Sequence, residues 1–248
     1  MSKILEVVAD SMQSAINAQK GGADRIELCD ALVIGGVTPS AGKIKMCVEQ
    51  LNLPIYVMIR PRGADFLYSN TDFELMLQNI ELAKELGAHG IVAGILKEDG
   101  DFHWKRMEAI VKASGPLPVT CHKAFDRCLN AQDALEGLID IGVKRVLTSG
   151  QQRTLREGYG VVKDLVAQAN GRIEIIAGGG LNTEVIDDLL KIEGLNEFHG
   201  AMRSNVRSKM NFLGHMTNTE KSIKHEFEWT EAGVEETRIL ADRIHYAV

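Results

Sequence analysis

Carboxylate and imidazole side chains recur near the ends of short β-branched segments of this 248-residue sequence. Glu6 and Glu27 lie in the first two segments, and His122 lies in the fifth, followed closely by Asp126. Because imidazole exchanges protons near neutral pH and carboxylates can act beside it, such a group could perform general acid–base chemistry. We therefore consider Glu6, Glu27, His122 and Asp126 the candidate catalytic residues.

Cationic side chains and a run of glycines could bind an anion beside these residues. Two arginines follow the third segment, and a guanidinium group can hold a carboxylate or phosphate through two parallel hydrogen bonds. A triple glycine after the seventh segment precedes an expected helix, where backbone N–H groups could hold a phosphate, although it could equally be a tight turn. The candidate ligand-binding residues are Arg60, Arg62, Lys123, Ser149, Gly178, Gly179, Gly180 and His199.

The same charged residues also allow a purely structural interpretation. Glu6, Glu27 and Arg60 could form a buried ion-pair network that fills the top of a barrel, because buried charges require partners. This network predicts that Arg60→Ala sharply lowers stability. A ligand-binding site predicts instead that the substitution removes anion binding and leaves the fold nearly unchanged.

Soft metal ligands are dispersed along the chain. It contains 7 His, 4 Cys and 9 Met, with no close cluster of chelating spacing. Because side chains alternate along a strand, Cys29 shares its orientation with Glu27 and is expected to face the same interior. Cys29 is therefore the candidate metal ligand, whereas Cys121, next to His122, should face a surrounding helix layer.

Strand-like segments alternate with amphipathic helical segments along the chain. This order indicates parallel strands joined by right-handed crossovers. Eight strands fit a closed (β/α)8 TIM barrel better than the alternative, an open doubly wound sheet. The expected strands are 4–8, 25–29, 55–60, 90–96, 119–123, 145–149, 173–177 and 197–201, and the helical segments include 11–20, 71–86, 104–113, 131–141, 161–169 and 184–192.

The chain is expected to form a single domain, residues 1–248. Its length is close to the ~250 residues of one such barrel, and no linker-like tract divides it. Residues 203–227 are polar and weakly periodic, so we expect an irregular insertion there, before a last helix from about residue 232 to 246. Functional residues of this fold lie at the C-terminal ends of the strands, where the candidates above are placed.

Composition argues against several classes of partner. The net charge of −6 disfavours nucleic acid or an anionic membrane surface as the main partner. The sequence has no apolar run of the length that spans a bilayer, and no secretory signal precedes the first strand. The four cysteines form no CxxC pair, so we expect reduced thiols and a cytoplasmic location.

Six sequence stretches occur in order along nearly the whole chain and together are distinctive. They are GGADRIELCDALVIGGVTPS (21–40), PIYVMIRPRGADFLYS (54–69), VTCHKAFD (119–126), RVLTSG (145–150), AGGGL (177–181) and EFH (197–199). In these stretches the chain resembles the CutC family, known as copper homeostasis proteins. The resemblance implies a cytosolic TIM barrel that forms homo-oligomers and has a link to copper, the one metal or cofactor it suggests.

The polar residues shared with that family coincide with the candidates named above and with Asp65, which follows the arginines after the third segment. One departure is Cys121-His122-Lys123, where Phe-His-Arg is usual in the family. Lys123 keeps the positive charge but lacks the planar fork of arginine, so it would hold an anion less specifically. The shared residues are Glu6, Glu27, Cys29, Arg60, Arg62, Asp65, His122, Asp126, Ser149 and His199.

Three functions remain open at this point. The first is binding or trafficking of copper, which predicts soft ligands near Cys29. The second is an enzyme that acts on a small phosphorylated or carboxylated metabolite, with Glu27 and His122 as acid–base groups. The third is a non-catalytic barrel that senses a ligand or serves as a scaffold. The residues favour the enzyme, whereas the resemblance favours copper.

Overall fold

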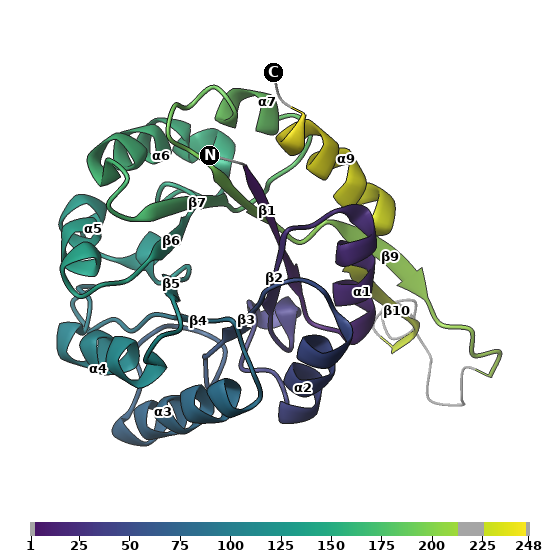
Figure 1. Ribbon diagram of the computed structural model, residues 1–248, viewed down its shortest axis with the longest axis horizontal. Helices are drawn as coiled ribbons and strands as arrows, with labels where there is room; N and C mark the ends of the chain where they lie inside the picture. The colour runs from purple at the N-terminus through teal and green to yellow at the C-terminus, as the bar shows by residue number, and fades with distance from the viewer. Residues whose placement is uncertain (1–2, 213–225, 247–248) are drawn as a thin grey trace.

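The protein is a closed barrel of parallel strands, as a computed structural model shows for residues 3–212 and 226–246 (Figure 1). Neighbouring strands pair in sequence order, and β8 pairs with β1 to close the barrel, which excludes the open sheet. The predicted (β/α)8 architecture is confirmed. The barrel strands are β1 (Ile4–Ala9), β2 (Arg25–Leu28), β3 (Ile55–Met58), β4 (Gly90–Ala93), β5 (Val119–Cys121), β6 (Arg145–Thr148), β7 (Glu174–Gly178) and β8 (Glu197–Gly200).

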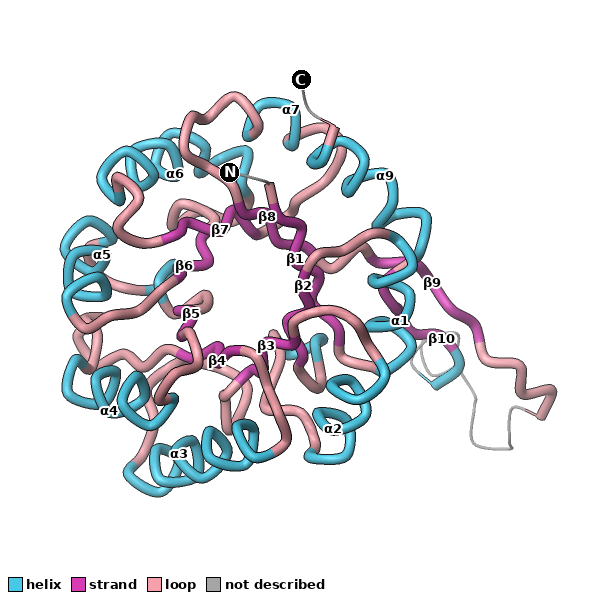
Figure 2. The backbone as a smooth tube through the Cα atoms, viewed as in Figure 1, coloured by secondary structure: helices cyan, strands magenta, loops and turns pink. Residues whose placement is uncertain are grey.

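Helices form an outer ring around the strands (Figure 2). Several begin at a Ser, Thr or Asn whose side chain accepts a backbone N–H of the first turn, as Ser11 and Thr154 do. No helix in the described part of the chain is long and apolar enough to cross a membrane. The helices are α1 (Met12–Gly21), η1 (Leu32–Ile34), α2 (Ala41–Gln50), α3 (Asn70–Glu85), α4 (Trp104–Ser114), η2 (Phe125–Arg127), α5 (Ala131–Asp140), α6 (Leu155–Ala169), α7 (Ile186–Leu189) and α9 (Val234–His245).

The observed elements differ from the expected ones in two respects. Helix α2 falls outside the expected helical segments, because its apolar stripe consists of only two buried residues, Ile44 and Cys47. Several strands also end earlier than expected. Arg60, His122 and Lys123 follow their strands rather than lie in them, so these side chains are carried by the loops at the C-terminal end of the barrel.

The two faces of each strand contribute to different interiors. In β1, Leu5 and Val7 pack in the main core between the barrel and the helices, whereas Val8 belongs to a second cluster inside the barrel. Cys29 lies in this inner cluster, and Cys121 lies in the main core. The predicted alternation is therefore confirmed for both cysteines.

A network of buried charges fills the half of the barrel toward the N-terminal ends of its strands. Arg25 donates from Nε to the Glu6 carboxylate at 2.5 Å and from Nη2 to Glu197. Arg145 donates to the other oxygen of Glu197 at 3.3 Å. Both guanidinium groups also lie over the ring of Tyr56, about 5 Å from its centre, which adds cation–π attraction.

This network corrects the expected structural interpretation. A buried ion-pair network does exist and does include Glu6, but its cations are Arg25 and Arg145 rather than Arg60. Arg25 and Arg145 begin their strands, at the N-terminal end of the barrel. Arg60 follows β3 at the opposite end.

Part of the segment expected to be irregular is a β-ribbon. Strand β9 (Arg203–Arg207) pairs antiparallel with β10 (Glu228–Ala232), directly before α9. Val206 lies opposite Trp229 and Arg207 opposite Glu228, and such apolar and opposite-charge pairs stabilise a two-stranded ribbon. Residues 213–225 of the segment lie outside the described residues.

Candidate active site

An open cavity of about 720 Å³ lies at the C-terminal ends of the strands. Its inner wall carries buried polar side chains from several strands and loops, namely Glu27, Arg60, His122 and His199. This is the end of the barrel where the sequence candidates were expected. The cavity is also lined by Leu32, Met58, Phe66, Lys123, Arg127, Leu147, Gly179, Gly180, Leu181, Met202, Arg203, Glu236, Ile239 and Leu240.

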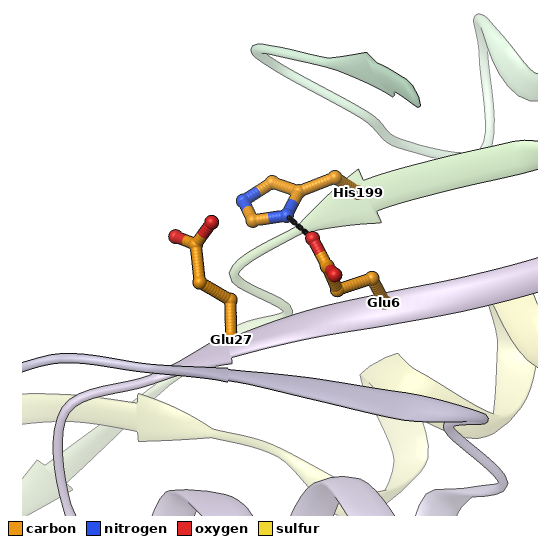
Figure 3. Close-up of side chains that lie close together, drawn as sticks. All are labelled: Glu6, Glu27 and His199. Atoms are coloured by element: carbon orange, nitrogen blue, oxygen red, sulfur yellow. Dashed lines mark hydrogen bonds and ion pairs between the residues drawn. The ribbon is translucent and has the colours of Figure 1, made fainter. Parts of the chain in front are cut away.

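An acid–base cluster is formed by Glu6 of β1, Glu27 of β2 and His199 of β8 (Figure 3). These three strands are neighbours in the barrel. Their ligand atoms all lie within 4.8 Å of one another. Glu6 Oε1 bonds His199 Nδ1 at 2.7 Å and so fixes the orientation of the imidazole ring. Figure 3 shows the Glu27 carboxylate facing the ring, without a bond to either neighbour.

The two carboxyl groups of this cluster have opposite pKa shifts. Burial alone would raise the pKa of Glu6, but Arg25 and His199 outweigh it and lower that pKa to about 2. Glu27 has no cationic partner in contact, so burial raises its pKa to about 7, and the charge of His199 offsets only part of the effect. Glu27 can therefore gain or lose a proton near neutral pH, whereas Glu6 stays ionised.

The two carboxylates favour the protonated form of His199. Burial lowers its pKa, but attraction to Glu27 and the bond to Glu6 reverse this effect and leave the pKa above 6.5. Glu27 and His199 therefore titrate as a pair.

His122 has a different role from the one expected. Its Nδ1 accepts the backbone N–H of Ala124 at 3.3 Å, so the ring proton lies on Nε2, and Nε2 is buried without a partner. Burial, with a contribution from the charge of Arg60, lowers the pKa of His122 to about 3. The ring packs on Phe66 with 4.8 Å between centres. At neutral pH, His122 is thus an uncharged hydrogen-bond donor rather than a group that titrates.

Arg60 is a buried cation without a carboxylate partner among the described residues. Its Nη1 donates to the carbonyls of Ile34 (3.1 Å) and Gly36 (2.7 Å), and its Nη2 donates to that of Ala64 (2.6 Å). Two N–H groups of the guanidinium donate to no carbonyl among the described residues: the second N–H of Nη2, and Nε, which is buried and forms no hydrogen bond there. The Tyr68 hydroxyl lies beside the guanidinium group. Backbone carbonyls therefore occupy three of the five N–H groups, and Nε is the buried donor left for a ligand.

The CutC family profile matches residues 3–204. The chain belongs to the CutC family. It is 42% identical over 238 residues to a mouse copper homeostasis protein cutC homolog, an alignment covering 96% of this chain and 88% of the mouse protein. The human homolog of the same name is 45% identical over 209 residues, covering 84% of this chain and 77% of the human one.

A solved CutC structure from Streptococcus agalactiae has the same fold. It matches with a TM-score of 0.76 at 32% sequence identity, and the match covers 80% of this chain and 98% of that one. The family resemblance seen in the sequence is confirmed.

Several candidates of this CutC-family barrel lie outside the cavity. Arg62 is paired with Asp65 at 2.8 Å on the surface. Asp126 accepts hydrogen bonds from the Thr148 and Ser149 hydroxyls and so anchors the loop after β6. The structure therefore gives Arg62, Asp126 and Ser149 supporting positions rather than places beside a ligand.

The triple glycine after β7 is divided between the two roles considered for it. Gly178 faces the barrel interior, where a side chain would meet Leu147 and His199. Gly179 and Gly180 line the cavity and have φ angles of 117° and 82°, a conformation that favours glycine. The following helix, α7, has only four residues. Any anion at this loop would thus be held by loop amides rather than by a helix dipole.

The soft-metal candidate, Cys29, is fully buried in the inner apolar cluster. Burial raises the pKa of its thiol, with Glu27 contributing, which disfavours the thiolate form that binds metals. Glu6, Glu27 and His199 are close enough for a metal, but Glu6 is already bonded to Arg25 and His199, and the charge of Arg25 opposes a cation there. We interpret these three residues as an acid–base cluster.

Three side chains of the site and its surroundings were not predicted from the sequence. Arg25 and Glu197 begin their strands, whereas the candidates were placed at strand ends. The available signal was that Arg25 is in phase with Glu27, and Glu197 with His199. Phe66, which contacts both Arg60 and His122, lies in a loop and gave no signal of its own.

Proposed function

We propose that the chain is an enzyme that moves a proton at a carbon atom beside the carbonyl group of a small metabolite. The proposal is carried by three polar groups that form no hydrogen bond within the described residues and belong to residues that line one cavity: the Glu27 carboxylate, His122 Nε2 and Arg60 Nε. Buried polar atoms are nearly always hydrogen-bonded, so unpaired ones at a cavity indicate where a ligand completes the bonding. One of these groups accepts a proton, and two donate hydrogen bonds.

In the proposed step, the Glu27 carboxylate takes a proton from the carbon next to the carbonyl. The C–H electron pair forms a C=C bond, and the carbonyl π electrons move onto oxygen. The N–H groups of His122 and Arg60 then stabilise the enolate oxygen, as preorganised donors do in a site with little water. Return of a proton to the same carbon completes exchange. Where that carbon carries a hydroxyl group, transfer of the hydroxyl proton to the enolate oxygen and protonation of the former carbonyl carbon complete an isomerisation without another reactant.

His199 can relay the proton that Glu27 receives. Glu6 holds Nδ1 of the ring, so the other ring nitrogen remains available on the side of Glu27 (Figure 3). A proton shared between Glu27 and His199 could return to carbon or pass to oxygen. Glu6 acts through His199 and is a positioning residue.

The proposal is tested by deuterium exchange. We expect the wild-type protein in D₂O to accelerate loss of the NMR signals of the protons beside the carbonyl in at least one of four ketones. These probes are hydroxyacetone, hydroxyacetone phosphate, 4-hydroxyphenylacetone and 4-phosphooxyphenylacetone. The rate should rise as pH passes about 7 and then level off, because Glu27 must be deprotonated to act.

Glu27→Gln should abolish this exchange, with Glu174→Gln as the matched control. Glu174 is a partly buried acid of the barrel whose pKa is also raised by burial, but it begins β7 and does not line the cavity. His122→Phe should slow exchange by roughly 10²–10³-fold through loss of one oxyanion donor. Exchange with no ketone, or equal exchange by Glu27→Gln, would overturn the proposal.

Copper binding is a second proposal, favoured by the names of the relatives and by a cysteine and a methionine that lie near one another in the inner cluster. The Cys29 Sγ and the Met58 methyl group lie 3.3 and 3.7 Å from the point where a Gly36 side chain would begin. A thiolate and a thioether are ligands that Cu(I) prefers, although two of them do not make a closed site.

We expect the purified protein to bind Cu(I) with modest affinity that depends on Cys29. A competition titration with a coloured Cu(I) chelator should show weaker binding by Cys29→Ser. Cys47→Ser should leave it unchanged, although Cys47 contacts the Met12 sulfur at 3.5 Å in the helix layer. Tight stoichiometric binding that survives Cys29→Ser would contradict this prediction.

A further inference from the structure

Part of the cavity wall beyond the acid–base cluster is apolar. Leu32, Leu181, Met202, Ile239 and Leu240 line it, and they come from the loops after β2, β7 and β8 and from α9. Such a wall favours a hydrocarbon or aromatic part of a ligand, because its burial removes apolar surface from water.

Three exposed cations, Lys123, Arg127 and Arg203, also line the cavity and form a basic rim. None of the three has an ion-pair partner within the described ranges. Among the described residues, the one acid of the outer wall is Glu236, whose carboxylate lies against Gly233, the N-cap of its own helix α9. The rim is thus positive on a chain whose net charge is −6.

The local backbone fixes the position of Arg203. The preceding residue, Met202, has a φ of 46°, and its carbonyl accepts the Gly233 N–H at 2.8 Å, so β9 starts at the cavity edge. Gly180 and Leu181 line the neighbouring wall, and their backbone N–H groups donate to no acceptor in the described part of the chain. Two kinds of unused donor therefore lie on the same side of the cavity.

We propose that the ligand of this cavity is a phosphate monoester with an apolar body, whose phosphate is held by Arg203, Lys123 and the amides of Gly180 and Leu181. The inference rests on the proposed function in one respect only, which is that the carbonyl group of the ligand lies beside Glu27. It moves the anion site away from Arg60 and Arg62, because backbone carbonyls occupy the fork of the first and Asp65 pairs with the second.

Calorimetric titration with phenyl phosphate, inorganic phosphate and phenol tests the inference. We expect phenyl phosphate to bind at least tenfold more tightly than either of the others, since burial of ~60 Å² of apolar surface corresponds to roughly a tenfold change. Its affinity should also fall as the salt concentration rises, because the rim is exposed.

Two variants separate the two parts of the site. Arg203→Gln should weaken the binding of phenyl phosphate and of inorganic phosphate alike, by roughly tenfold. Ile239→Ser should weaken the binding of phenyl phosphate alone. The matched control is Arg238→Gln, on the same helix as Ile239, because Arg238 pairs with Glu235 at 2.6 Å and does not line the cavity.

Equal affinities for phenyl phosphate and inorganic phosphate would overturn the apolar part of the inference. Unchanged binding by Arg203→Gln, or phenol binding as tightly as its phosphate ester, would overturn the anion site. Glu27→Gln should still bind phenyl phosphate. Phosphate-ester binding without any ketone exchange would therefore reject the proposed function alone, and equal exchange of 4-hydroxyphenylacetone and its phosphate would reject only this inference.

Discussion

Arg25→Met lowers the free energy of unfolding by roughly 3–5 kcal/mol at pH 7, the largest loss of stability expected from one substitution in the barrel. Arg25 is buried and bonds both Glu6 and Glu197. Its removal leaves two buried carboxylates without their shared cation, and methionine cannot replace the lost hydrogen bonds. Denaturation by guanidinium chloride, followed by circular dichroism, measures the change.

Arg172→Met provides the matched control. Arg172 also pairs with a glutamate, Glu136, at 2.7 Å, but both side chains are nearly half exposed. A solvent-exposed pair contributes about 1 kcal/mol or less, so this variant should remain close to wild type. If the two arginine variants lose the same stability, the buried network does not support the barrel in the way described here.

The barrel was predictable because its sequence signal is repeated along the chain. Most strands are short and β-branched, and most are followed by an expected helical segment, so an error at one element does not change the topology. The ends of the strands were less predictable. Arg60 and His122 continue an apolar run in the sequence, but the chain leaves the ladder before them to form the loops of the mouth.

The candidate site was only partly predictable, because alternation gives the side of a strand and not the partner of a side chain. It placed Glu27 and Cys29 correctly inside the barrel. It could not show that Arg25 would neutralise Glu6 and leave Glu27 unpaired, because that depends on the stagger between β1, β2 and β8. Alternation also could not predict that Arg60 lines the cavity and Arg62 does not, because the loop after β3 turns Arg62 toward Asp65.

Glu27→Gln is expected to stabilise the fold at pH 8 while it abolishes exchange. The pKa of Glu27 is about 7 in the folded chain, against 4.5 for an ordinary glutamate, so the folded state binds this proton more tightly. Protonated Glu27 therefore contributes to the free energy of unfolding below pH 4.5, and this contribution is lost as pH rises through about 7. Each pKa unit corresponds to 1.36 kcal/mol, so the wild type loses on the order of 3 kcal/mol at pH 8. Glutamine does not ionise and avoids this loss.

Glu6→Gln should behave in the opposite way, although Glu6 lies within 4.8 Å of the same histidine. Its pKa of about 2 means that its ionised form stabilises the fold above pH 4.5 and loses that effect as pH falls toward 2. Glu6→Gln therefore lowers the free energy of unfolding at pH 8, and the difference from wild type becomes smaller as pH falls. Unfolding curves of both variants from pH 3 to 8 give the comparison. If Glu27→Gln also destabilises at pH 8, Glu27 is part of the structural network, and the case for it as the base fails.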